Sequence, residues 1–195
     1  MQRLRWAIAI LTIVVGTAAA ETPTTEVVAW PARLRALYVG GGVSYLGHQS
    51  LGGPGVTGAQ GWGFGRWQLG AETSVRWLPG AGVAVRAALD TKWLARSFRP
   101  DSSGAIELYL DAGIGAELIA AHGTMLARPD LRFGWGLQVR DVGRFRIRLA
   151  IRITLAPSLS REEAEGLTCR GMCKTTTSSS PPLDEGFETL VGIAW

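Results

Sequence analysis

The chain has 195 residues, of which 47% are hydrophobic and 18% are charged, and its formal net charge is +4. This length suits one domain, and after the first twenty residues no apolar run approaches the length of a membrane-spanning helix. The small excess of basic residues does not indicate a protein that binds nucleic acid.

Residues 1–20 have the pattern of a secretory signal peptide. Two arginines precede a short apolar run, and small residues ending in Ala20 come before Glu21. A basic start, a short apolar run and an Ala-x-Ala motif predict cleavage after Ala20. Cleavage would remove both arginines and lower the formal net charge from +4 to +2. We expect residues 21–33 to form a lead-in, and residues 34–195 to form the folded domain.

Beyond the lead-in, apolar and polar residues alternate, which is typical of strands with one apolar face. Trp67 and Trp77 lie ten residues apart on the apolar face of the clearest segment. A strand of this length spans roughly 33 Å, or about 25 Å when it is tilted by about 40°, which matches the lipid-facing band of a membrane barrel. The pattern predicts strands over residues 35–46, 67–77, 82–98, 105–120, 130–140, 144–155 and 187–195.

Turn sequences separate these strands, and two glycine-containing segments, 47–60 and 99–104, are predicted as longer loops. Bacterial single-chain barrels have even strand numbers, and about 22 residues per strand and connection favours eight strands. We expect the missing strand within the long loop 157–186, around residues 167–176.

The last predicted strand places Phe187, Val191 and Trp195 on one face and ends on that tryptophan. It resembles the closing strand of bacterial outer-membrane barrels, whose final aromatic residue is read by the assembly machinery. The resemblance to small barrels of the OmpA and OmpX type extends over the signal peptide and nearly all of the mature chain. It implies an all-β fold, a single antiparallel up-and-down transmembrane barrel in the bacterial outer membrane. The implied partners are membrane lipids and the barrel assembly machinery.

Alternation alone does not decide which face is inside, because a soluble lipocalin-like barrel also alternates, with its apolar face inward. The apolar face carries no charge across the strand interiors, and tryptophans lie near its edges. Both features favour the membrane version, with the polar face inside. The predicted aromatic girdle consists of Trp67, Trp77, Trp93, Trp135 and Trp195.

With the polar face inside, an acidic strand lies between two basic ones, and cross-strand ion pairs become possible. An eight-stranded barrel is only wide enough for side chains to fill, which favours a salt-bridged plug. The alternative is a narrow conduit biased toward anions by Arg146, Arg148 and Arg152. The predicted lumen charges are Glu72, Arg76, Arg86, Asp90, Lys92, Arg96, Glu107, Asp111, Glu117, Arg132, Arg140, Arg146, Arg148 and Arg152.

The two cysteines, Cys169 and Cys173, lie in the least regular segment. Export implies an oxidising compartment, so we predict a disulfide between them. A metal site would need more ligands nearby, and His48 and His122 are distant in the sequence. We expect no metal and no cofactor.

His48 and the pair Asp101-Ser102 lie in the two longer predicted loops. They resemble the catalytic residues of the lipid A palmitoyltransferase barrels, which implies His48 as the base and Ser102 as the nucleophile of an acyl transfer. The amphipathic N-terminal helix of that family is missing, and such residues are common in polar loops. We therefore expect no enzyme activity, and a structural or surface-interaction role.

Overall fold

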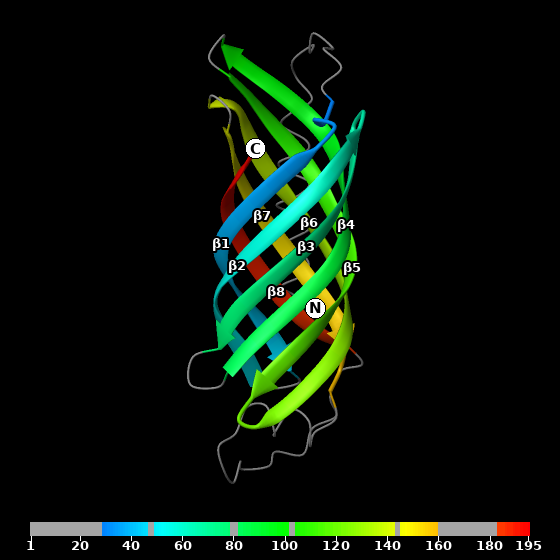
Figure 1. Ribbon diagram of the computed structural model, residues 1–195, viewed down its shortest axis with the longest axis vertical. Coiled ribbons are helices and arrows are strands. Elements are labelled where there is room, and N and C mark those ends of the chain that lie inside the picture. The colour runs from blue at the N-terminus through cyan, green and yellow to red at the C-terminus, as the bar shows by residue number, and fades with distance from the viewer. Residues whose placement is uncertain (1–28, 47–48, 79–81, 102–103, 143–144, 160–182) are drawn as a thin grey trace, which may run out of the picture.

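The computed structural model describes residues 29–46, 49–78, 82–101, 104–142, 145–159 and 183–195. Eight antiparallel strands form one closed barrel in which each strand pairs with its neighbours in sequence and β1 pairs with β8 (Figure 1). The predicted all-β, eight-stranded up-and-down barrel is confirmed. The strands are β1 (Leu34–Leu46), β2 (Gln49–Phe64), β3 (Trp67–Leu78), β4 (Gly82–Asp101), β5 (Gly104–Ala121), β6 (Thr124–Val142), β7 (Phe145–Pro157) and β8 (Leu183–Ala194). Within the described ranges, no helix is long and apolar enough to cross a membrane.

The strand that the sequence pattern does not reveal is β2. The prediction of a loop over residues 47–60 is wrong, because residues 49–61 of β2 pair with β1. Glycine occupies six of its sixteen positions, so the alternation of apolar and polar side chains is hidden. One of these glycines has a packing reason: a side chain at Gly61 would collide with Gln68 in the lumen. The segment 167–176 lies outside the described residues.

Several strands also extend further than predicted. The expected loop over residues 99–104 is wrong, since β4 continues to Asp101 and β5 begins at Gly104. β6 begins at Thr124, and β8 begins at Leu183, inside the expected loop 157–186. The connection between β7 and β8 therefore spans residues 158–182.

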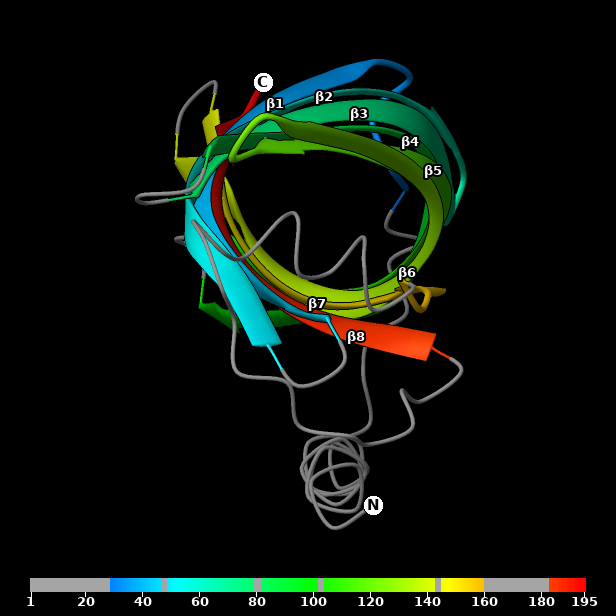
Figure 2. The same cartoon turned by 90° about the horizontal axis from the view of Figure 1, so that it is seen from below.

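The polar face of every strand is inside the barrel, as predicted. Leu89 and Ile114 on the outer face are 65% and 61% exposed, whereas Arg132 and Arg152 on the inner face are 1% and 0% exposed. Figure 2 looks along the barrel and shows the strands as a single ring. A protein with this distribution buries its charges and presents apolar side chains to its surroundings.

The start of β1 and the end of β8 meet at one end of the barrel, which we call the terminal end. There, Arg35 and Trp195 exchange two backbone hydrogen bonds of 2.9 Å. The connections at this end are residues 65–66, 102–103 and 143–144, two residues each. The opposite end, the loop end, carries residues 47–48, 79–81, 122–123 and the long segment 158–182. In outer-membrane barrels, short turns face the periplasm and longer loops face outward.

His122 and Gly123 form the two-residue turn between β5 and β6, with φ angles of 48° and 81°. A β-branched residue is poorly suited to this left-handed conformation, which costs most residues about 1–2 kcal/mol. We expect His122→Ile to lower the free energy of unfolding by that amount, measured by urea titration in detergent micelles. His122→Asn is the matched control and should leave stability within a few tenths of a kcal/mol, because Asn tolerates positive φ. Equal losses in both variants would contradict this reading of the turn.

Candidate functional site

The middle of the lumen is organised around Arg152 of β7, which reaches across the barrel. Its guanidinium donates to both carboxylate oxygens of Glu72 on β3 at 2.7 and 2.9 Å, and to Asp111 on β5 at 2.9 Å. Arg132 of β6 donates to the same Glu72 carboxylate at 2.5 Å. These four residues, the central cluster, are at most 5% exposed. Because β3 and β7 are not neighbours, the cluster ties opposite walls of the barrel together.

A second group of charges lies between the central cluster and the loop end. Glu117 of β5 accepts from Arg76 at 2.8 Å and Arg128 at 3.2 Å, and it pairs with Arg86 at 3.4 Å. The arginines in turn reach further carboxylates at 2.7 to 3.3 Å, namely those of Asp130, Asp184 and Glu188. Each charge therefore has at least one partner of opposite sign.

Nearer the terminal end, Arg148 is 1% exposed and has neutral partners among the described side chains. It donates to Gln138 at 2.6 Å and to the Tyr38 hydroxyl at 3.1 Å. Its guanidinium also lies over the rings of Trp30 and Tyr109, 5.0 and 5.6 Å from their centroids. Aromatic faces attract a cation, and more strongly when both are desolvated.

Both ends of the lumen are closed by apolar side chains. At the terminal end, Trp30 is 5% exposed, packs with Leu94 and Tyr109, and donates its backbone N–H to Gly65 at 2.8 Å. The loop end is filled by a cluster made of Leu51, Leu78, Ala84, Ile119, Ala121 and Leu159. A cavity beside Arg76 and Arg86 measures about 10 Å³, which is barely room for one water molecule.

The Trp30 indole donates its N–H to the carbonyl of Arg66 at 2.9 Å. Trp30→Phe removes this bond, but Leu94 still donates to the same carbonyl at 2.8 Å. We therefore expect a loss of about 1 kcal/mol in the free energy of unfolding, the net value of one hydrogen bond. The measurement is a urea titration in detergent micelles. Trp67→Phe is the control, because Trp67 is 53% exposed. It should change the free energy of unfolding by less than about 0.5 kcal/mol. Similar losses in the two variants would argue against a specific plug at Trp30.

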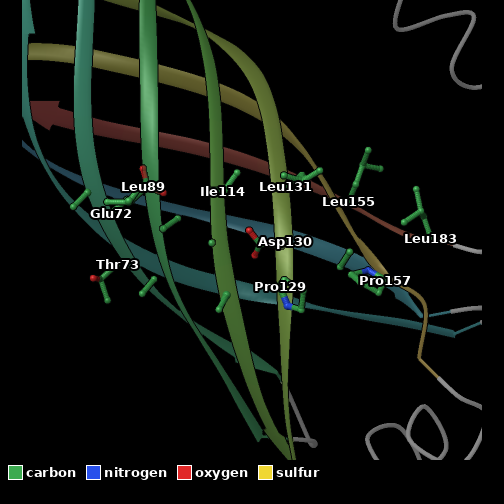
Figure 3. Close-up of a pocket in the computed structure, with 16 residues that line it drawn as sticks. Glu72, Thr73, Leu89, Ile114, Pro129, Asp130, Leu131, Leu155, Pro157 and Leu183 are labelled. Carbon is green, nitrogen blue, oxygen red and sulfur yellow. The ribbon is translucent and has the colours of Figure 1, made fainter.

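A hollow of about 770 Å³ lies on the outer face across β3 to β8 (Figure 3). A row of small side chains forms its floor, and Leu89, Ile114 and Leu131 flank that row; the small residues are Thr73, Ala87, Ala116 and Pro129. Glu72 and Asp130 lie at the hollow but are buried, and they pair with arginines of the lumen. No charged group therefore converges on it, so its lining fits acyl chains rather than a polar solute.

No protein-family model matches this chain, and no curated protein matches its sequence. Among solved structures, the barrel is similar to Neisserial surface protein A (NspA), with a TM-score of 0.56 and 9% identity over 84% of this chain and 96% of that one. It is also similar to the N-terminal β-barrel domain of Pseudomonas aeruginosa OprF, with a TM-score of 0.50 and 12% identity over 84% and 98% of the two chains. Identities this low show a shared fold alone. At that level, the resemblance to small outer-membrane barrels is confirmed.

The structure brings most of the predicted lumen charges together. Eleven of them are buried, namely Glu72, Arg76, Arg86, Asp90, Lys92, Glu107, Asp111, Glu117, Arg132, Arg148 and Arg152. Lys92 pairs with Asp90 and, at 3.6 Å, with Asp111. Arg140 and Arg146 are half-buried near the terminal end, where Arg140 pairs with Glu107 at 3.1 Å.

The prediction that Arg96 points into the lumen is wrong. Its backbone is paired with Leu108 and that of Phe98 with Ile106, so both residues are on the outer face. A register shift between Leu94 and Arg96 inserts one extra residue into β4. Such a bulge reverses the alternation of faces beyond it, which the sequence pattern did not indicate.

Sequence reasoning also missed several members of the lumen network. Arg128 and Asp184 lie in parts of β6 and β8 that were not predicted as strand. Asp130 begins the predicted strand 130–140 but was not named as a lumen charge, although Arg128, Asp130 and Arg132 alternate with apolar residues. Glu188 alternates with Phe187 and Thr189 in the same way. Trp30 precedes the first strand, and no periodicity marks it.

The tryptophans of the predicted girdle are all on the outer face. Trp67 and Trp93 are paired across β3 and β4 at the terminal end, with ring centroids 6.3 Å apart. Trp77 is 49% exposed at the loop end of β3, and Trp195 is 48% exposed at the terminal end. Trp135 is half-buried on β6. The spacing from Trp67 to Trp77 therefore spans the outer face from end to end.

An acyl-transfer site built from His48, Asp101 and Ser102 would require the two connections that carry these residues to lie at the same end of the barrel. The connection between β1 and β2 is at the loop end, whereas the connection between β4 and β5 is at the terminal end. An even number of intervening strands would be needed to bring the two connections to the same end, and three strands, β2 to β4, separate them. His48 and Ser102 themselves lie outside the described residues.

Two other sequence predictions are untested. Cys169 and Cys173 lie outside the described residues, and so does the signal peptide. Within the described ranges, no three His, Cys, Asp or Glu side chains are grouped so that they could hold a metal ion.

Proposed function

We propose that this protein is an integral barrel of the bacterial outer membrane, without catalytic activity, with a structural or surface-interaction role. The observation that carries the proposal is the inversion of polarity: the outer face is apolar, and the charges are buried inside. A fold of this kind needs a surrounding hydrocarbon phase to cover its outer face. The long connection 158–182 at the loop end offers a contact surface on the outside of the cell.

The packed lumen supports a structural rather than a conducting interior. Among the described residues, the buried charges comprise seven cations and eight carboxylates, so they nearly balance. Arg152, one of the three arginines expected to attract anions, is occupied by Glu72 and Asp111. Arg148 lies beneath Trp30. An anion would have to displace these partners in order to pass.

Conductance in planar bilayers tests this interior directly. Full-length protein, refolded and checked for complete folding by its gel mobility without heating, should produce no discrete current steps. Reproducible steps with a preference for anions would establish the narrow conduit and contradict a packed lumen. Incubation of the same preparation with labelled lipid A or phospholipid should produce no acyl transfer; a transferred label would contradict the non-catalytic role.

We further propose that the C-terminal strand is recognised by the barrel assembly machinery. Trp195 is 48% exposed, and its backbone bonds join it to Arg35 at the barrel seam. Deleting Trp195 removes two of the many seam bonds, so refolding from urea into detergent should be near normal. The yield in cell membranes should fall severalfold. An unchanged membrane yield would argue against recognition through this residue.

A further inference from the structure

Among the side chains that the structure describes, the charges that reach the outside of this barrel are distributed unevenly between its ends. Arg35 and Arg66 are exposed at the terminal end, and Arg96 is half-buried there on the outer face. The loop end has an exposed acidic residue among the described side chains, Glu185. We call Arg35, Arg66 and Arg96 the arginine belt.

The belt lies among aromatic side chains on the same end of the outer face. Arg66 directly precedes Trp67, which packs against Trp93. The guanidinium of Arg96 lies 4.9 Å from the centre of the Phe98 ring. Aromatic residues of membrane proteins gather at the headgroup level, and long arginine side chains extend from the apolar surface to the same level. The belt therefore lies at the height of lipid headgroups.

Within the described residues, no member of the belt forms an ion pair. The bulge in β4 places Arg96 in the belt, because it turns this side chain from the lumen to the outer face, away from the lumen carboxylates. A guanidinium at the membrane interface is tolerated, whereas one at the midplane of the bilayer is costly. It also matches phosphate in shape and charge, since it can donate two parallel hydrogen bonds.

We propose that the arginine belt binds the phosphate groups of anionic phospholipids in the leaflet around the terminal end. This inference rests on the proposed membrane location and adds a ligand class to it. Bound headgroups would fix the height of the barrel in the membrane and would distinguish its two ends.

The test measures which lipid headgroups lie next to the protein. The full-length chain is refolded into phosphatidylcholine vesicles that contain a trace of phosphatidylglycerol or phosphatidylcholine with a dansyl group on one acyl chain. Energy transfer from tryptophan reports how strongly each probe associates. The wild-type protein should prefer the anionic probe severalfold, since one arginine near an anionic surface corresponds to about fivefold.

The triple variant Arg35→Gln, Arg66→Gln, Arg96→Gln should lose this preference, and the corresponding triple lysine variant should retain most of it. Glu185→Gln, at the loop end, is the matched control and should leave the preference unchanged. If the triple glutamine variant does not insert, the three single glutamine variants are measured instead. Each of them should lower the preference for the anionic probe.

Two results would overturn the inference. The first is insertion of the wild-type protein with equal association of the two probes, and the second is a preference that survives the glutamine substitutions. A preference that sodium phosphate lowers more than sodium chloride of equal ionic strength would support recognition of the phosphate group itself. Failure of the wild-type chain to insert into vesicles at all would instead contradict the proposed membrane location.

Discussion

Ala71→Arg is expected to destabilise the barrel in bilayers by about 2–4 kcal/mol, the cost of a cation near the bilayer midplane. Ala71 is exposed on the outer face of β3, four residues from Trp67 and six from Trp77. It also lies at the hollow whose lining fits acyl chains. An arginine there has no carboxylate within reach on the outer face, since neighbouring Glu72 is turned inward. The measurement is reversible urea unfolding in phosphatidylcholine vesicles.

Met125→Arg is the matched control for this variant. Met125 is 70% exposed on the outer face, two residues beyond the turn at Gly123. A cation near the interface costs about 0–1 kcal/mol, so the control should fold almost as well as the wild type. If Ala71→Arg is also tolerated, the outer face of β3 does not contact lipid and the membrane assignment is wrong.

Arg152→Met is expected to lower the free energy of unfolding by about 3–5 kcal/mol, because it breaks a buried ion pair from one side. The side chain is fully buried, and its removal takes away two hydrogen bonds from Glu72 and two from Asp111. Methionine keeps most of the aliphatic volume of arginine. The loss of stability therefore measures the removal of the charge and not the creation of a cavity. Urea titration in detergent micelles gives the difference directly.

Arg33→Met is the control for Arg152→Met. Arg33 is exposed ahead of β1, and its substitution should change stability by less than about 0.5 kcal/mol. A water-filled lumen would make the two variants behave alike, since water would solvate Glu72 after the arginine is lost. Equal small effects would therefore contradict the packed lumen.

The alternation of apolar and polar residues predicts well which side chains point outward and which point into the lumen. The reason is that each strand has an apolar outer face and packed charges on its inner face. Trp67 to Trp77 in β3 and the arginines of β7 follow this rule without interruption. The rule fails where side chains are missing, as in the glycines of β2, and where a residue is inserted, as before Arg96. Neither event leaves a trace in a period-two pattern.

The ion-pair partners of the charged residues could not be predicted in the same way. Alternation indicates which face a residue is on, but it does not indicate which side chains that residue contacts. Arg152 and Glu72 are far apart in the sequence and meet only because the barrel closes. The sequence predicted cross-strand ion pairs between the acidic strand and its basic neighbours without naming the pairs, and the structure forms two of them between Arg86 and Glu117 and between Lys92 and Asp111. Trp30 enters the lumen from outside the strands, so only the folded chain shows that it closes the terminal end.

Fractionation of a Gram-negative host that expresses the full-length chain tests the central claim most directly. The protein should be recovered in the outer-membrane fraction, and its band should migrate differently with and without boiling, because a closed barrel resists unfolding by detergent until it is heated. Recovery in the soluble periplasmic fraction, or one mobility under both conditions, would contradict an integral outer-membrane barrel.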